Sequence, residues 1–119
     1  IAVNGEVIKN EWLTQPPEAV RSYAYCADTL YDESIAVKCS NATLLYHEAT
    51  YLDDQKEKAM SRMHSTSRQA AAIALKADAH RLILGHFSSR YEHLEGFAAE
   101  AREIFPHTDL ALEGATYLV

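Results

Sequence analysis

The sequence predicts a layered α/β domain with a partly parallel sheet. Short apolar runs of strand character alternate along the chain with segments of helical periodicity, and such alternation is typical of a parallel sheet covered by helices. The length of 119 residues allows one domain over 1–119. The hydrophobic fraction of 48% and the charged fraction of 24% are those of an ordinary globular protein, so disorder and coiled coil are excluded for the chain as a whole.

The first half of the chain contains a predicted hairpin and then strands and helices in turn. Asn4-Gly5 is a strong signal for a two-residue turn, and it predicts a hairpin over residues 1–8. Pro16-Pro17 holds the following loop extended. Runs of β-forming and apolar residues predict the next strands, and a segment with acidic residues first and basic residues last predicts a helix. They are a strand over 20–26, a short helix over 32–38, a buried strand over 42–46 and a charged helix over 53–62.

The second half of the chain contains two predicted capping boxes, each at the start of a helix. Thr66 and Gln69 fit the first, which opens an alanine-rich helix that runs to Ala77. Ser89 and Glu92 fit the second, and the helix that it opens is expected to end at Pro106. The remaining predicted elements are a fully buried strand over 81–85, and short terminal strands, or a final β-turn-β, over 110–112 and 115–119.

Charge and cysteine content narrow the class of protein. The net charge of −6 argues against a nucleic-acid-binding surface spread over the whole domain, but it permits a local site where a metal cation offsets carboxylates. Cys26 and Cys39 are too few for a disulfide scaffold and favour a reducing cytoplasm. The sequence contains neither a membrane-spanning apolar run nor a signal-peptide pattern. Because the first residue is Ile1, we expect the chain to derive from a longer reading frame or to be processed.

Acidic and imidazole side chains follow the predicted strands. Asp28 follows the first strand of the predicted sheet, His47 and Glu48 follow the next, and His86 follows the third. His64 lies two residues before the N-cap of the alanine-rich helix. Ligands in open α/β sheets bind beyond the carboxyl ends of the strands, so these side chains are expected to meet there. Imidazole and carboxylate groups are zinc ligands, so the pattern indicates a metal-assisted hydrolase.

Each of these residues also has a simpler explanation. Asp28 is explained about equally well as the cap of a following helix. His47 and His64, each taken alone, are better explained as structural or loop histidines. Arg90 is explained by the start of the last helix, although an arginine beside a metal centre suits a phosphate. The role of His47 stays open, as do those of the histidines for which a surface position is expected, His80, His93 and His107.

Four motifs, in this order along the chain, resemble the carboxyl-terminal part of the ribonuclease Z family. They are Tyr25-Cys26-Ala27-Asp28-Thr29, His47-Glu48-Ala49-Thr50-Tyr51, His64-Ser65-Thr66 and His86-Phe87-Ser88-Ser89-Arg90-Tyr91. The family comprises tRNA 3′-processing endonucleases of the metallo-β-lactamase superfamily. The resemblance covers essentially the whole chain, and its one small departure is Ala27, where the family usually has glycine.

The resemblance implies a fold and partners. The chain is expected to be the carboxyl-terminal half of a metallo-β-lactamase-like αββα sandwich, with one mixed sheet and helices on one face. The other face of the sheet is expected to be apolar, because the missing amino-terminal half packs against it. An exposed apolar patch of that size needs a partner, so we also expect a homodimer or a companion chain.

The resemblance also implies an activity and roles for particular residues. The parent protein is expected to be a zinc-dependent endoribonuclease that removes the 3′ trailer from precursor tRNA with two zinc ions. Asp28 would bridge both metals, His86 would bind one, His64 would donate a proton with Glu48 orienting it, and Arg90 would contact substrate. The family's other metal ligands and its tRNA-binding arm lie upstream, so the fragment alone is expected to be inactive. The alternatives are another phosphodiesterase of the superfamily and a non-catalytic structural half-domain.

Overall fold

The computed structural model describes residues 2–3, 6–7, 21–112 and 114–118. Strands β1 (Ala2–Val3) and β2 (Glu6–Val7) pair antiparallel, so the predicted amino-terminal hairpin is confirmed. Asn4-Gly5 and Pro16-Pro17, on which the sequence argument for this region depended, lie outside the described residues.

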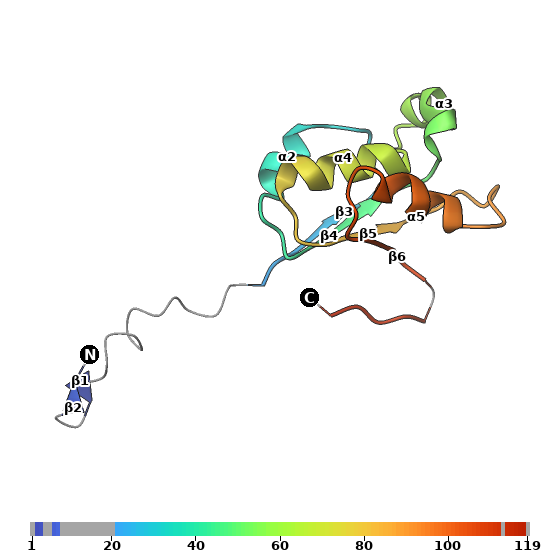
Figure 1. The fold of residues 1–119 in the computed structure, drawn as a ribbon. Helices are drawn as coiled ribbons and strands as arrows, with labels where there is room; N and C mark the ends of the chain where they lie inside the picture. Colours follow the sequence, from blue (N-terminus) through green and yellow to red (C-terminus); the bar gives the residue numbers. More distant parts are fainter. Residues whose placement is uncertain (1, 4–5, 8–20, 113, 119) are drawn as a thin grey trace.

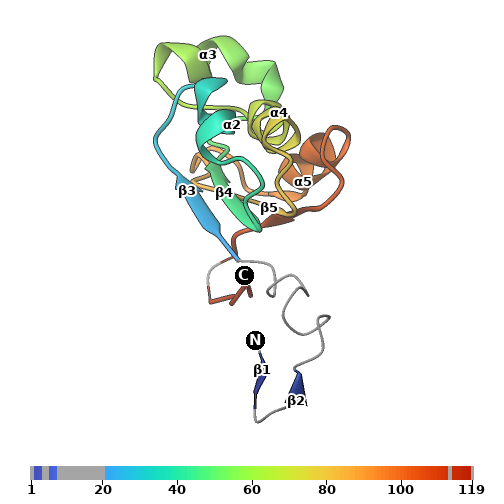
Figure 2. The ribbon, with the colours of Figure 1, turned by 90° about the vertical axis from the view of Figure 1, so that its left-hand side faces the viewer.

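A four-stranded sheet forms the centre of the domain, as Figures 1 and 2 show. Its order is β3-β4-β5-β6, and each neighbouring pair is parallel. The sheet was expected to be mixed, but its four described strands are all parallel, because each of them is joined to the next by a helical crossover. The strands are β3 (Tyr23–Cys26), β4 (Leu44–Glu48), β5 (Leu82–Gly85) and β6 (Thr108–Leu110).

The helices that cover the sheet lie on one of its faces, as predicted (Figure 2). The crossovers contain α2 (Ser34–Lys38), the 3-10 turn η1 (Asp53–Gln55) with α3 (Lys56–Ser61), α4 (Ser67–Ala77) and α5 (Glu95–Arg102). Helix α4 lies between α2 and α5 and packs on β4 and β5. None of the described helices is both long enough and apolar enough to cross a membrane.

Helix α4 follows directly from its sequence. The Thr66 hydroxyl accepts from Gln69 N–H at 3.2 Å, and the Gln69 side chain accepts from Thr66 N–H at 3.0 Å, which confirms the first capping box. The residues of α4 that face the sheet have small or branched apolar side chains, and they are fully buried together with apolar residues of the strands. This core includes Ala70, Ile73, Ala74, Leu45, Leu82 and Leu84.

The second predicted capping box is wrong. Helix α5 begins at Glu95, and its N-cap Leu94 makes no side-chain cap. The Tyr91 hydroxyl accepts from Leu52 N–H at 3.1 Å, and its ring packs edge-on against Phe97 with centroids 4.9 Å apart. These tertiary contacts hold the segment as a turn where the local sequence alone favours a helix. The helix also ends at Arg102, before Pro106.

Two further boundaries differ from the prediction. Strand β4 extends to Glu48, so His47 and Glu48 are its last residues and do not follow it. They stay in the sheet because His47 and Glu48 pair in register with Leu84 and Gly85 of β5. At the end of the chain, β6 accounts for residues 108–110, and residues 115–118 form no strand.

The sheet face opposite the helices is largely aromatic. Tyr23 and Tyr25 of β3 are about half or more exposed, at 51% and 64%. The rings of Tyr25 and Tyr46 stack with centroids 4.6 Å apart. A hollow of about 220 Å³ lies on this face, and its lining residues are Tyr23, Leu44, Tyr46, Ile83, Ala111 and Tyr117. The face therefore exposes the apolar area that the sequence analysis expected.

The Tyr46 ring depends on the absence of a side chain at Gly85. A Cβ at Gly85 would overlap the Tyr46 ring and hydroxyl, whereas a Cβ at Gly96 in α5 would lie 3.6 Å from a Leu52 methyl, an ordinary contact. We predict that Gly85→Ala lowers the free energy of unfolding by about 1–3 kcal/mol, because the ring must leave its stacked position. Gly96→Ala is the matched control and should be neutral or stabilise by up to about 1 kcal/mol. Urea unfolding measures both, and equal midpoints for the two variants would contradict the prediction.

Candidate metal centre

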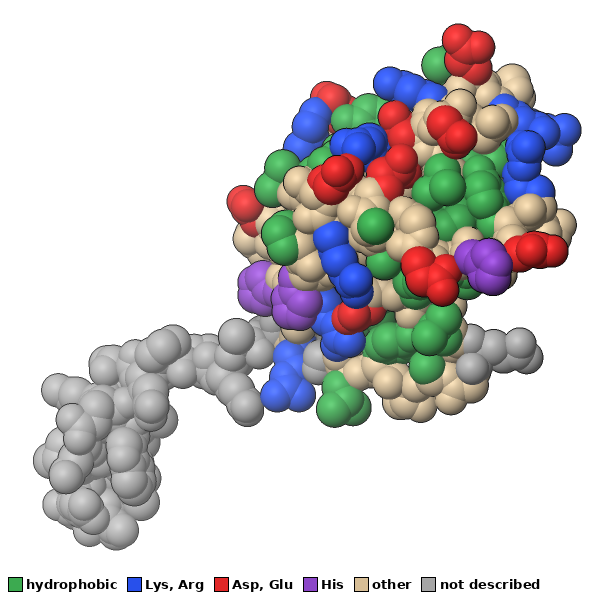
Figure 3. All heavy atoms as spheres, turned by 45° about the vertical axis from the view of Figure 1, so that its right-hand side comes forward, with side chains coloured by type: hydrophobic (Ala, Val, Ile, Leu, Met, Phe, Trp, Pro, Cys, Tyr) green, Lys and Arg blue, Asp and Glu red, His purple; other side chains and the backbone are tan. Residues whose placement is uncertain are grey.

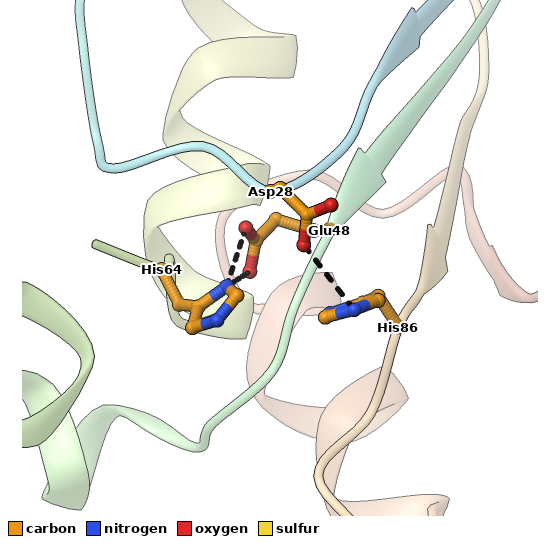
Figure 4. A group of neighbouring side chains, drawn as sticks. All are labelled: Asp28, Glu48, His64 and His86. Atoms are coloured by element: carbon orange, nitrogen blue, oxygen red, sulfur yellow. Dashed lines mark hydrogen bonds and ion pairs between the residues drawn. The ribbon is translucent and has the colours of Figure 1, made fainter. Parts of the chain in front are cut away.

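Four side chains from different parts of the chain meet at the carboxyl-terminal edge of the parallel sheet (Figure 4). Asp28 lies just after β3, Glu48 ends β4, His64 precedes α4, and His86 comes directly after β5. Each offers a carboxylate oxygen or imidazole nitrogen, and these atoms all lie within 4.8 Å of one another. The predicted convergence of Asp28, His64 and His86, with Glu48 beside His64, is thus confirmed.

Glu48 is a fully buried carboxylate that accepts from four donors. Oε1 accepts from Thr29 N–H at 2.5 Å, and Oε2 accepts from the Thr50 hydroxyl at 2.5 Å and from Ser65 N–H at 3.1 Å. His64 Nδ1 lies 2.9 Å from Oε1 and 3.1 Å from Oε2. Burying a charge is costly unless hydrogen bonds replace its hydration, and these donors replace it. Glu48 thereby joins the loop after β3, the end of β4 and the segment before α4.

The contact with Glu48 decides the tautomer of His64. An ionised carboxylate can only accept, so the hydrogen of the neutral His64 ring lies on Nδ1. Nε2 is therefore the free nitrogen of that ring. The ring lies near the His86 ring, with centroids 5.3 Å apart, and near the amino-terminal end of α4. His64 is thus held by a buried anion while its other nitrogen remains available.

Asp28 and His86 form the more exposed part of the group. Asp28 Oδ1 lies 3.3 Å from His86 Nε2, and their side chains are 72% and 46% exposed. Both residues have left-handed backbone conformations, with φ of 49° and 61°. Such conformations cost about 1–3 kcal/mol in residues other than glycine and cluster at functional sites. Asp28 does not cap the helix that follows it, because α2 begins only at Ser34.

The donor set fits a zinc ion in part. Carboxylate oxygen and imidazole nitrogen are both zinc ligands, and the facing atoms of Asp28 and His86 are the ones that a cation would join. Glu48 is less suited, because a metal would have to compete with its four donors. A catalytic zinc uses three protein ligands and one open position.

Two other sequence candidates lie outside the group. The Arg90 guanidinium lies 3.4 Å from Gln55 Oε1 and over the Tyr91 ring at 5.9 Å. His47 is fully buried in β4, where its Nδ1 lies 2.8 Å from the Glu48 carbonyl oxygen, and its Nε2 has no hydrogen-bond partner among the described residues. Burial lowers the pKa of His47 below its ordinary value, and the nearby Glu48 opposes this to a smaller extent.

Sequence reasoning missed the groups that support the site. Thr29, Thr50 and Ser65 each donate to Glu48, and the Ser65 hydroxyl also donates to the Thr29 carbonyl at 2.6 Å. All three stand inside the motifs that were singled out. Their role depends on which backbone amides and hydroxyls point at Glu48, and no spacing pattern reveals that.

The buried His47 should make the fold sensitive to acid. The unfolded chain protonates this histidine near its ordinary pKa of about 6.5, whereas the folded chain does so only at lower pH. Between these values the unfolded state binds more protons, so the stabilisation is complete above about pH 6.5 and is lost as pH falls. We predict that the urea midpoint of His47→Asn falls less between about pH 7.5 and about pH 5 than that of the parent.

The matched control for this measurement is His80→Asn, because His80 is exposed. This variant should keep the parent's pH dependence. If His47→Asn loses stability in acid as steeply as the parent does, the buried neutral histidine is not the cause.

Comparisons with known proteins agree with the four motifs. No protein-family model matches the chain. Proteins named Ribonuclease Z from Parabacteroides distasonis and Nostoc punctiforme are 46% and 43% identical to it over 114 and 115 residues. These alignments cover 96% and 92% of this chain but only 38% and 36% of the relatives. The chain therefore spans little more than a third of the length of the curated relatives that it matches.

Solved structures give the same result for the fold. The metallo-β-lactamase fold protein YhfI from Bacillus subtilis aligns over 78% of this chain and 37% of its own, with a TM-score of 0.73 and 30% identity. The short form of human tRNase Z aligns over 72% of this chain and 27% of its own, with a TM-score of 0.52 and 35% identity. The predicted resemblance is confirmed: the chain is homologous, over almost all of its length, to part of the proteins named Ribonuclease Z, and it forms part of a metallo-β-lactamase fold.

Proposed function

We propose that this chain is the carboxyl-terminal part of a zinc-dependent endoribonuclease that removes the 3′ trailer from precursor tRNA. The observation that carries the proposal is the meeting of two available metal ligands, Asp28 and His86, with a histidine held by a buried carboxylate, His64 and Glu48. The relatives named Ribonuclease Z and the human tRNase Z support the substrate class.

Cleavage of a phosphodiester needs a nucleophile, neutralisation of charge on the phosphate and a proton for the leaving oxygen. Asp28 and His86 would hold zinc, which when bound lowers the pKa of water and neutralises phosphate charge. When the bond between phosphorus and the 3′ oxygen breaks, His64 would donate the proton from Nε2 to that oxygen. Glu48 would stabilise the protonated ring beforehand and would keep the hydrogen on Nδ1 afterwards. The products are a 3′ hydroxyl on the tRNA and a 5′ phosphate on the trailer.

Substrate binding would depend only in part on this chain. Acidic and basic side chains are interspersed over the face in Figure 3, in keeping with the net charge of −6. A phosphate backbone is bound mainly through lysine and arginine, so most of the affinity for tRNA would come from other parts of the protein. Arg90, whose guanidinium is exposed, would contribute a local phosphate contact.

The aromatic sheet face would be covered by the rest of the longer protein. An exposed apolar surface of this kind is typical of an interface. We propose that an amino-terminal half packs there and supplies the remaining ligands of a two-zinc centre, and that the complete protein is a cytoplasmic homodimer. The chain alone would then be an inactive half-domain.

A second candidate function is the hydrolysis of another phosphodiester by the same centre. The observation in its favour is that YhfI, described only as a metallo-β-lactamase fold protein, superposes with a higher TM-score than the human tRNase Z. The chemistry at Asp28, His64 and His86 would be unchanged. A longer protein that cleaves small phosphodiesters and leaves precursor tRNA intact would favour this candidate.

The roles of His64 and Asp28 can be separated in the longer protein that carries this chain. His64→Ala should lower kcat on precursor tRNA by about 10²–10⁴-fold and keep its zinc, because it removes the proton donor, which is also one of the four donors to Glu48, but no proposed metal ligand. Asp28→Ala should lose zinc together with activity. Cleavage assays and metal analysis measure both, and His80→Ala is a control at an exposed position. Cleavage at the parental rate by His64→Ala would refute the proton-donor role, and loss of zinc in that variant would make His64 a ligand or a support.

The metal content of the chain alone tests the proposed division between two halves. Asp28 and His86 supply two ligands where a catalytic zinc needs three, so the purified chain should not retain two zinc ions through gel filtration. Mass spectrometry of metals in the eluted protein measures this. Two tightly held zinc ions per chain would show that the centre is complete without other segments.

A further inference from the structure

We infer that Thr50 is a positioning residue whose hydroxyl connects Glu48 to His86 and sets the tautomer of the His86 ring. The hydroxyl would hold the ring with its hydrogen on Nδ1 and thereby leave the lone pair of Nε2 directed at Asp28. This inference deepens the proposed function, and it rests on that proposal only where it assigns the Nε2 lone pair to a metal.

The direction of the two hydrogen bonds follows from counting hydrogens. Thr50 Oγ1 lies 2.5 Å from Glu48 Oε2 and 3.0 Å from His86 Nδ1. A hydroxyl has one hydrogen, and an ionised carboxylate has none, so Thr50 donates to Glu48. The contact with His86 can then form only if Nδ1 carries a hydrogen and donates it to Oγ1. The neutral His86 ring therefore has no hydrogen on Nε2.

The position of this hydroxyl is fixed by the backbone around it. Thr50 N–H donates to the Ser65 carbonyl at 3.0 Å, and the Thr50 carbonyl accepts from Ser88 N–H at 3.0 Å. The residue is buried, and a β-branched side chain has few rotamers. Thr50 thus joins the segment that carries His64 to the segment that follows His86, and its hydroxyl lies between Glu48 and His86.

The consequence appears at Asp28. With its hydrogen on Nδ1, His86 presents a lone pair to a carboxylate oxygen 3.3 Å away, so two acceptors face each other. A positive charge between them makes this arrangement favourable: either a proton on Nε2 of a charged His86 ring or a metal ion that both atoms bind. One carboxylate would then set two rings, His64 by direct contact and His86 through Thr50. Both Nε2 atoms would be free, one for a metal and one for proton transfer.

The test compares two variants of the 119-residue chain. Thr50→Ser keeps the hydroxyl, and Thr50→Val keeps the branched shape but removes it. The chain is labelled with nitrogen-15, and long-range proton–nitrogen correlation spectra are recorded without metal at about pH 8, above the ordinary pKa of histidine. These spectra report which ring nitrogen carries the hydrogen in each histidine.

The parent and Thr50→Ser should both show His86 with its hydrogen on Nδ1, and Thr50→Val should shift the population toward Nε2–H. His64 should keep its hydrogen on Nδ1 in all three chains, because Glu48 is intact, and this shows that the effect is local. A parent chain with the hydrogen of His86 on Nε2 overturns the inference even if Thr50→Val does not fold. An unchanged tautomer in folded Thr50→Val overturns it as well.

A zinc titration gives a second readout that does not depend on cleavage of any substrate. Partners that orient a metal-bound histidine are worth about 10- to 100-fold in affinity. Thr50→Val should weaken zinc binding to the chain by that factor relative to Thr50→Ser, as measured by competition with a chromophoric chelator. Equal affinities would refute the positioning role. If the longer protein proves inactive on tRNA while the tautomer and affinity results hold, the proposed function fails and this inference stands.

Discussion

The structure around the candidate site depends on a single buried carboxylate. Glu48 is fully inaccessible, and an isolated charge in such a place would cost several kcal/mol. Its four donors come from Thr29, from Thr50 and from the adjacent His64 and Ser65, which lie on three segments of the chain. The need to satisfy this carboxylate therefore fixes how these segments approach one another. Asp28 and His86 each lie one contact away from that network, through Thr29 and Thr50.

The same network explains how strained backbone persists at the site. Asp28 and His86 both have positive φ, which residues with a Cβ rarely adopt. The peptide after Asp28 is held by the bond from Thr29 N–H to Glu48, and the His86 ring is held by the Thr50 hydroxyl. Hydrogen bonds to a buried anion are stronger than ordinary ones, so they can offset about 1–3 kcal/mol of strain at each residue. The geometry of the exposed pair is thus set from inside the domain.

The sequence predicts the fold well where local and tertiary signals agree. Helix α4 has a capping box, a run of alanines and one buried face, and all three point to the same element. The prediction fails at Ser89, where a local capping signal is overruled because Tyr91 is anchored to Leu52 and Phe97. It also misplaces the end of β4, since pairing with β5 carries the strand on to Glu48. Such pairings are made by distant parts of the chain, so no local pattern contains them.

At the candidate site too, part of the arrangement could be predicted from the sequence and part could not. Asp28, His64 and His86 could be placed together because the ends of parallel strands meet at one edge. The donors around Glu48 could not, since they are backbone amides and hydroxyls whose direction depends on the folded loops. His47 shows that a polar residue next to a site residue in sequence need not lie at the site. It neighbours Glu48 in sequence, yet strand alternation turns it to the helix-covered face, where it is buried away from the group.

The two parts of the site differ in how far this chain completes them. The part suited to proton transfer is supplied by this chain, because all four donors to Glu48, including His64, come from its own residues. The part suited to metal binding is open, since Asp28 is largely exposed, His86 is about half exposed, and together they supply two ligands. Both parts lie at the edge of a sheet whose far face presents Tyr23 and Tyr25 to the outside. An element that covers that face would bring further side chains to the same edge, so under the proposed function, burial of the aromatic face and completion of the metal centre would be one event.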